Sequence, residues 1–263
     1  MVLPLYADDP LEGQSRAYVT WGLIALNTVV FLAVVTLSDA WQEYLVATLG
    51  FTPAVAIREW PFPGPFPRDL TLLSSMFMHA NAFHLLGNML FLWVFGDDIE
   101  DAIGHLRFLI FYLVCGIAGA LLFLLQDPHS KITLIGASGA ISGVLTAFLL
   151  LRPCAKIEVF VYFWPFGVRA LYVIGLWIAM QVFSIAMQAD DGIAYWDHIG
   201  GVLAGAFLIL FLRPAKLPLF ECLWPTKEWD EAHGHTRRWA LEHILVLGTM
   251  AIAVLAYVSL VEH

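Results

Sequence analysis

Long apolar stretches separated by short polar connections dominate this chain. Six of them approach the length of a membrane-spanning helix, and they are continuous rather than alternating, which predicts helices and not the strands of a membrane barrel. We expect the six helices at 18–37, 72–95, 106–125, 132–151, 168–187 and 194–212. A further apolar stretch at 239–260 predicts a seventh helix, the weakest of the set because Glu242 and His243 lie near its start. The expected fold is an all-α polytopic membrane protein.

The polar connections divide the chain into three parts. Residues 1–17 carry three acidic side chains and lack the positive start of a signal peptide, so we expect a short leader. The connection at 38–70 is rich in aromatic residues and prolines, which is typical of a loop lying among lipid headgroups. We therefore expect a leader at 1–17, a six-helix core at 18–212, and a connection with the seventh helix at 213–263.

Composition agrees with a membrane protein and excludes several classes. Hydrophobic residues make up 60% of the chain and charged residues only 13%, about half the usual share in soluble domains. The net charge of −9 argues against nucleic-acid binding, which needs a basic face. The three cysteines, Cys115, Cys154 and Cys222, have spacings that fit neither a zinc site nor a disulfide framework, so we expect structural thiols.

Lysine and arginine predict the orientation of the helices. With the N-terminus in the cytoplasm, ten of the thirteen basic residues lie on the inner side, and only Arg58, Arg68 and Lys131 lie outside. Because cytoplasmic loops carry an excess of positive charge, this orientation is favoured.

A glycine-rich stretch from Gly136 to Gly143 interrupts the fourth apolar segment around Ser138. Small residues at spacings of three and four can serve close helix packing, and on this stretch alone packing is the favoured interpretation. The alternative is a nucleophilic serine at a helix N-terminus, where free amides and the helix dipole suit a developing oxyanion. A helix from Ser138 to Leu151 would rise about 21 Å. This places the serine about 10 Å below the outer surface of a 30 Å hydrocarbon core.

Three other polar side chains are expected at a similar depth: His84, Asn88 and His198. His84 and Asn88 are four residues apart and therefore share a helix face. Ionisable groups inside a membrane are rare and are functional candidates by default. His198 would act as the base that activates Ser138 and then as the acid for the leaving amine. His84, Asn88 and the Ser138 amide would donate hydrogen bonds to the oxyanion.

Glycines would let the two helices pack closely enough for this arrangement. Gly201 and Gly205 in the sixth segment have a spacing that matches the small residues of the fourth segment, which include Gly136 and Gly139. We expect the two stripes to pack together, which brings the histidine of one helix beside the serine of the other.

Three short motifs follow one another on three membrane segments: His84-x-x-x-Asn88, Gly136-x-Ser138-Gly139 and Asp197-His198-x-Gly200-Gly201. This ordered set resembles the rhomboid intramembrane serine proteases, from about residue 18 to 212. The last segment resembles the extra helix of the six-plus-one members. The resemblance implies a rhomboid-like six-helix bundle with a Ser138–His198 dyad and an oxyanion site at His84 and Asn88. It implies transmembrane-protein substrates, no cofactor or metal, and a multi-pass protein of the bacterial plasma membrane whose active site opens outward.

Other polar residues receive other interpretations. Some rhomboid members have an aromatic ring four residues after the nucleophile, stacked on the histidine; Ser142 stands there, so another feature must hold the imidazole. Asp197 is expected to cap or to be solvated rather than to act as a third catalytic member, since adjacent helical residues do not share a face. His79 and Glu100 are expected to be structural.

Two functions of different classes remain open. The first is an intramembrane serine endopeptidase. The second is a non-catalytic rhomboid-like protein that binds transmembrane helices, and it is disfavoured because such relatives typically lose the serine or the histidine. A metalloprotease would need an HExxH-like helix, and a soluble α/β-hydrolase would need GxSxG, where this chain has Ala140. A channel or transporter would often show inverted repeats, and none is visible in this sequence.

Overall fold

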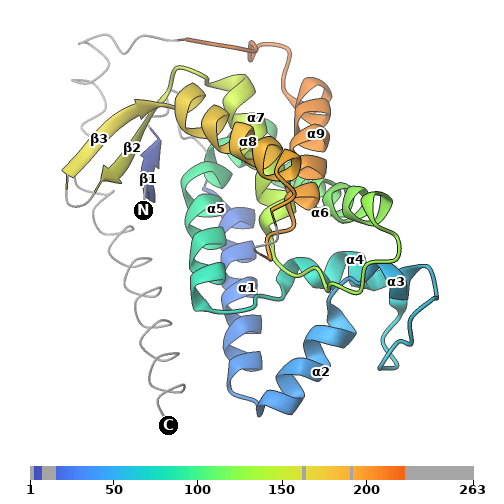
Figure 1. The fold of residues 1–263 in the computed structure, drawn as a ribbon. Coiled ribbons are helices and arrows are strands. Elements are labelled where there is room, and N and C mark those ends of the chain that lie inside the picture. The colour runs from blue at the N-terminus through green and yellow to red at the C-terminus, as the bar shows by residue number, and fades with distance from the viewer. Residues whose placement is uncertain (1–2, 8–15, 162–163, 190–191, 223–263) are drawn as a thin grey trace.

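The computed structural model of this chain describes residues 3–7, 16–161, 164–189 and 192–222 (Figure 1). Six long helices form the bundle in these residues: α1 Tyr18–Val35, α5 Ala82–Ile103, α6 His105–Gln126, α7 Ser138–Leu151, α8 Ala170–Ala186 and α9 Tyr195–Leu212. The predicted helical class is confirmed. The expected helix at 239–260 lies outside the described residues.

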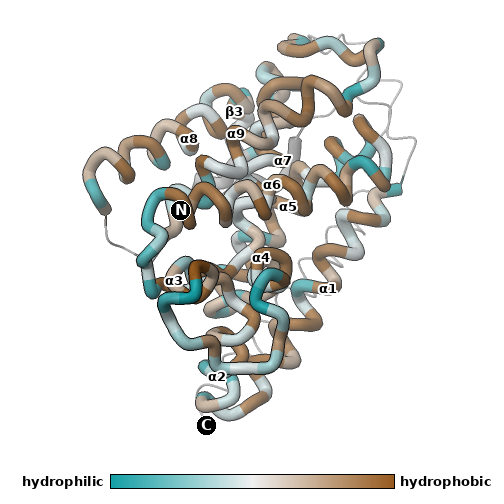
Figure 2. The backbone as a smooth tube through the Cα atoms, turned by 90° about the vertical axis from the view of Figure 1, so that its right-hand side faces the viewer, coloured by the Kyte–Doolittle hydropathy of each residue, from teal (hydrophilic) through white to brown (hydrophobic). Residues whose placement is uncertain are grey.

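Helix α7 is the centre of the bundle. Eleven of its fourteen residues are buried, and α5, α6, α8 and α9 all contact it. By contrast, α1 buries four of its eighteen residues and α8 three of its seventeen. The peripheral helices α1 and α8 therefore expose apolar side chains, and hydrophobic colour predominates along α1 in Figure 2.

By length and composition, α1, α6 and α9 can each cross a membrane, while α7 and α8 are shorter apolar helices. Helix α5 is long enough, but it ends in a group of carboxylates: Asp97, Asp98, Glu100 and Asp101. Glu100 is fully buried, and its two oxygens accept hydrogen bonds from the backbone amides of Val19 and Thr20 and from the Thr20 hydroxyl. This carboxylate therefore satisfies free amides at the N-terminus of α1, where a negative charge is favourable.

The connection between α1 and α5 contains short helices. They are α2 Asp39–Leu49, α3 Pro53–Ala56, η1 Arg68–Leu70, α4 Thr71–Ser74 and η2 Ser75–Phe77. The predicted helix at 72–95 is therefore wrong at both ends. Asn81 caps the true start of α5 by accepting a hydrogen bond from the His84 amide at 2.9 Å. The Ser75 carbonyl accepts from the Met78 amide, in the last turn of η2, and from the remote Gly136 amide.

A three-stranded antiparallel sheet lies at one end of the bundle and was not predicted. Its strands are β1 Leu3–Ala7, β2 Lys156–Val161 and β3 Trp164–Arg169, in the order β1-β2-β3. The expected leader thus contributes the first strand, and the connection between α7 and α8 contributes the other two (Figure 1).

After α9 the chain returns to the C-terminal end of α7. The amides of Phe220 and Glu221 donate to the carbonyls of Leu150 and Leu151, which the end of a helix leaves free. The Glu221 carboxylate also pairs with the buried guanidinium of Arg152.

A disulfide bond joins Cys154 to Cys222, two residues 68 apart in sequence. The expectation of three structural thiols is therefore wrong for this pair. It is their approach in the fold, and not their spacing along the chain, that makes the bond possible. Cys115 is a free, buried thiol.

Candidate active site

Ser138 is the first residue of α7 and is half-buried. The extended stretch before it is held by backbone hydrogen bonds: Phe51 pairs with Leu134 in both directions, and the Gly136 amide donates to the Ser75 carbonyl at 2.9 Å. Non-helical backbone is tolerated at membrane depth only where protein or water satisfies it, and these bonds do so. The chain can therefore start a helix at the serine, and the first amides of α7 have no partner within the helix itself.

Gly136 brings the backbone close to α5. Its φ of +123° lies in a region that favours glycine. A Cβ at this position would lie 2.7 Å from Nε2 of His84 and 3.6 Å from Nδ2 of Asn88. The absence of a side chain is thus what allows the two polar groups of α5 to face the strand that leads into Ser138.

Asn88 and His79 form a hydrogen-bonded pair, with 3.0 Å between Asn88 Nδ2 and His79 Nε2. Because the amide nitrogen donates, His79 Nε2 is the acceptor. The His79 ring also lies edge-on to the His84 ring, with centroids 5.1 Å apart. His79 was expected to be structural; its ring contacts the Asn88 amide at 3.0 Å and orients it.

His198 lies one turn into α9 and contacts α8. Its Nδ1 is 2.8 Å from Oε1 of Gln181. The ring of Trp177 lies 5.8 Å from the imidazole, centroid to centroid, at an interplanar angle of 36°. Gln181 and Trp177 are the features that hold the imidazole, the role for which the sequence alone suggested no residue. Their only signal in the sequence is a glutamine and a tryptophan, four residues apart in an apolar segment.

Asp197 is 3% exposed, and its carboxylate lies against the backbone of two glycines on other helices. A Cβ at Gly139 would lie 2.6 Å from its Oδ1, and Gly119 approaches it equally closely. The Gly139 amide donates a hydrogen bond to this carboxylate. Asp197 therefore caps the N-terminus of α7 from α9, rather than being solvated, and it faces away from the neighbouring His198.

Glycines form the contact between α7 and α9. A Cβ on Gly201 would collide with the carbonyl oxygen of Gly139, and one on Gly205 would collide with the carbonyl oxygen of Gly143. The two helix backbones therefore approach more closely than side chains permit, as in other small-residue helix pairs. In sequence, this contact is one residue from Ser138 on α7 and three residues from His198 on α9.

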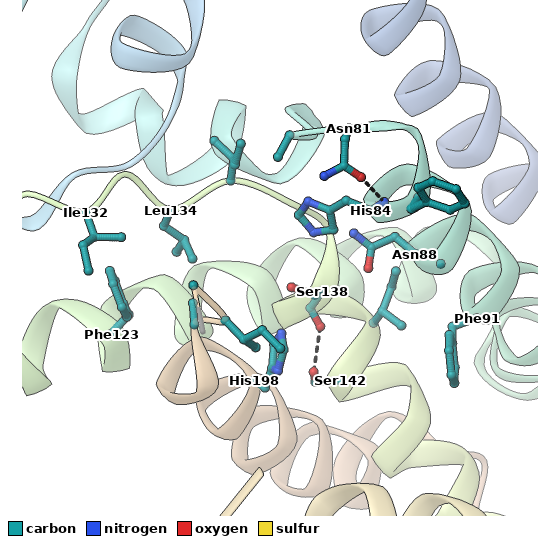
Figure 3. Close-up of a pocket in the computed structure, with 18 of the residues that line it drawn as sticks. Asn81, His84, Asn88, Phe91, Phe123, Ile132, Leu134, Ser138, Ser142 and His198 are labelled. Carbon is teal, nitrogen blue, oxygen red and sulfur yellow. Dashed lines mark hydrogen bonds between the residues drawn. The ribbon is translucent and has the colours of Figure 1, made fainter. Parts of the chain in front are cut away.

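A cavity of about 680 Å³ is lined by the four polar residues singled out in the sequence: Ser138, His198, His84 and Asn88. Figure 3 shows Ser138 with His198 on one side and with His84 and Asn88 on the other. The remaining wall is largely apolar and includes Phe91, Trp177 and Ile193 among others. A hydroxyl, an imidazole and two further donors thus share one apolar cavity, which is the set that acyl transfer requires.

Among the described residues, no group of three histidine, cysteine, aspartate or glutamate side chains is close enough to hold a metal ion. The polar side chains of the cavity and the Ser138 amide at the start of α7 are the groups that a substrate would meet.

Comparison with known proteins matches more than half of this chain to one family. The family model described as Rhomboid domain matches residues 68–215, which include all four polar cavity residues. Rhomboid protein 1, mitochondrial, from Saccharomyces cerevisiae is 33% identical over 156 residues, covering 56% of this chain and 42% of the yeast protein. RHOMBOID-like protein 5 from Arabidopsis thaliana is 25% identical over 190 residues, covering 72% of this chain and 59% of the plant protein.

Rhomboid protease GluP from Bacillus subtilis is 31% identical over 149 residues, covering 57% of this chain and 27% of that protein. The chain thus spans less than two thirds of the length of each of these three relatives. The family match and the apolar helices together make this chain an integral membrane protein.

Proposed function

Because this chain belongs to the rhomboid family, we propose that it is an intramembrane serine endopeptidase that hydrolyses peptide bonds in or near transmembrane helices. The observation that carries the proposal is the shared cavity of Ser138, His198, His84 and Asn88. A similar protein carries the name rhomboid protease. Substrates are membrane proteins whose helices can enter a site buried among apolar helices.

The proposed reaction begins with attack of Ser138 Oγ on the substrate carbonyl carbon. As that bond forms, the hydroxyl proton passes to Nε2 of His198, since Nδ1 is occupied by Gln181. The negative charge on the carbonyl oxygen is stabilised by donors from His84, Asn88 and the Ser138 amide; one such donor typically contributes about 2.7–4 kcal/mol. His198 then protonates the leaving amine, and water hydrolyses the acyl-enzyme by the same steps.

We further propose that the protein lies in a bacterial plasma membrane with its N-terminus in the cytoplasm and its active site opening outward. The distribution of basic residues supports this orientation, because Arg152, Lys156 and Arg169 all lie at the end of the bundle that carries the sheet. In this proposal residues 18–212 are the catalytic core, 1–17 a cytoplasmic leader, and 213–263 a connection with the seventh helix. Alkaline phosphatase fusions placed after α6 and after α7 test it: only the first is expected to be active.

The catalytic proposal is tested with purified full-length protein and a single-pass substrate that has small residues near the outer end of its helix. We expect wild type to cleave it, and Ser138→Ala and His198→Ala to be inactive. Ser184→Ala serves as the matched control, because this serine lies on α8 and does not line the cavity. A fluorophosphonate probe should label wild type and not Ser138→Ala.

Cleavage that persists in Ser138→Ala would overturn the proposal. Binding of transmembrane helices without cleavage or labelling would instead favour the non-catalytic function. Relatives named rhomboid-like make that second outcome worth measuring.

A further inference from the structure

Gln181 is a buried amide on α8, a helix most of whose residues are not buried. Only three residues of α8 are buried, Ala170, Ile174 and Gln181, and the glutamine side of the helix faces α9. Gln181 is 6% exposed. An amide placed in an apolar environment costs free energy unless its hydrogen-bonding groups are satisfied, so such a residue needs partners.

Both ends of this amide have a partner, and together they determine its orientation. Nε2 donates to the carbonyl oxygen of Trp177 at 3.4 Å, and Oε1 lies 2.8 Å from Nδ1 of His198. The opposite orientation would set two acceptors, Oε1 and the Trp177 carbonyl, against each other. Because Oε1 carries no hydrogen, His198 Nδ1 must be the donor. The neutral ring is then protonated at Nδ1 and has its lone pair at Nε2.

We propose that Gln181 is a positioning residue for His198, serving as a neutral third member beside the Ser138–His198 pair. This inference rests on the proposed protease function. Asp197 is not available for the role, because its carboxylate is held at the Gly139 amide. Gln181 touches neither substrate nor Ser138; it acts by fixing which nitrogen of the imidazole can accept a proton.

The proton balance of the reaction leaves Gln181 unchanged. The Ser138 Oγ–H bond breaks as Oγ bonds to the carbonyl carbon, and the proton moves to His198 Nε2. The ring is then positively charged, and the Nδ1–H···Oε1 bond becomes a hydrogen bond to a charged donor, which is the stronger kind. When the proton leaves with the amine, the neutral ring returns with the same tautomer.

The test compares two replacements of similar length in the full-length protein. Gln181→Met keeps the volume and removes the acceptor, whereas Gln181→Glu keeps an acceptor oxygen. We expect Gln181→Met to lower kcat about 10- to 150-fold with KM unchanged, the range for one hydrogen bond to a charged group. Gln181→Glu should retain more activity than Gln181→Met.

Asn27→Leu is the matched control. Asn27 is also a buried amide in a membrane helix, and it donates to the carbonyl four residues earlier at 2.8 Å, yet it does not line the cavity. We expect this variant to lower the thermal midpoint without lowering kcat. Nitrogen-15 NMR of the histidines provides a direct readout: the His198 signals, assigned with His198→Ala, should report the Nδ1–H tautomer in wild type and a mixture in Gln181→Met.

The outcomes separate the two proposals. Wild-type cleavage with an unchanged kcat in Gln181→Met, or with equal loss in Gln181→Glu and Gln181→Met, overturns the positioning role and leaves the protease function standing. A lower thermal midpoint in Gln181→Met at constant kcat also overturns it, because the residue is then only structural. If wild type fails to cleave, or Ser138→Ala still cleaves, the protease function fails and the positioning role fails with it.

Discussion

Replacing Gly201 with alanine tests whether the close approach of α7 and α9 is what assembles the site. The added Cβ would collide with the carbonyl oxygen of Gly139 and would lie 3.1 Å from Cβ of Ser142. The first obstacle is helix backbone and not the end of a flexible side chain. The clash can therefore be relieved only if α9 moves away from α7.

The size of the effect follows from this geometry. Overpacking a close contact typically costs about 1–3 kcal/mol, and we expect about 3 kcal/mol here because no side chain can yield. The contact lies one residue from Ser138 on α7 and three residues from His198 on α9. Any separation of the helices is therefore transmitted to the proposed dyad of Ser138 and His198, and a misplacement of about 1 Å can lower the rate about 100-fold.

Gly22→Ala is the matched control for this experiment. Gly22 is also inside a membrane helix, α1, but a Cβ there would meet no atom within 4 Å. The control should be neutral or gain about 0.5–1 kcal/mol from helix propensity. Thermal unfolding in detergent and kcat/KM on a transmembrane substrate are measured for both variants at equal folded concentration.

Gly201→Ala should therefore lower both the thermal midpoint and kcat/KM. If both quantities equal those of wild type, the backbones of α7 and α9 do not touch as described. If the midpoint falls but kcat/KM stays constant, the packing is real but does not position the dyad.

Three further predictions concern other parts of the chain. The Glu59 carboxylate accepts a hydrogen bond from His129 and raises the pKa of the His129 imidazole above its ordinary 6.5, so Glu59→Gln should lower that pKa in an NMR titration. The stabilising contribution of the pair is present below about pH 6.5 and is lost as the pH rises through the raised pKa. Because the proposed location of Cys154 and Cys222 is cytoplasmic, thiol trapping should find both reduced in cells. After oxidation they should form the disulfide bond, which adds about 4 kcal/mol of stability by the chain-entropy argument. Glu100→Gln should lower the free energy of unfolding by about 1.5–3 kcal/mol, since a buried carboxylate then no longer caps α1.

Apolar length was enough to predict most of the bundle, because a helix is the simplest way to satisfy backbone groups in lipid. It failed at the start of α5, where residues before and after Asn81 are equally apolar. There the helix boundary depends on the Asn81 cap and on the Ser75 carbonyl, which bonds Gly136. The second of these partners is remote in sequence, so no local pattern marks the break.

The sheet and the disulfide were missed for a related reason. Strand β2 pairs with β1, from the far end of the chain, and Cys222 reaches Cys154 only after α8 and α9 have been placed. Neither strand pairing nor the approach of the two cysteines is encoded by periodicity within one segment. Long-range pairings of this kind become predictable only when the packing of the helices is known.

The environment of His198 shows how the same limit applies to the site. Asp197 is the neighbour of His198 in sequence, but adjacent helical positions point in different directions. The group that contacts the imidazole is Gln181, 17 residues earlier and on another helix. A single glutamine in an apolar segment is a weaker sequence signal than a charged residue. A neutral acceptor nevertheless suits this cavity, because it orients the ring without adding a buried charge that would itself need compensation. The proposed catalytic arrangement therefore requires α8 to be docked against α9, in addition to the three helices that carry the motifs.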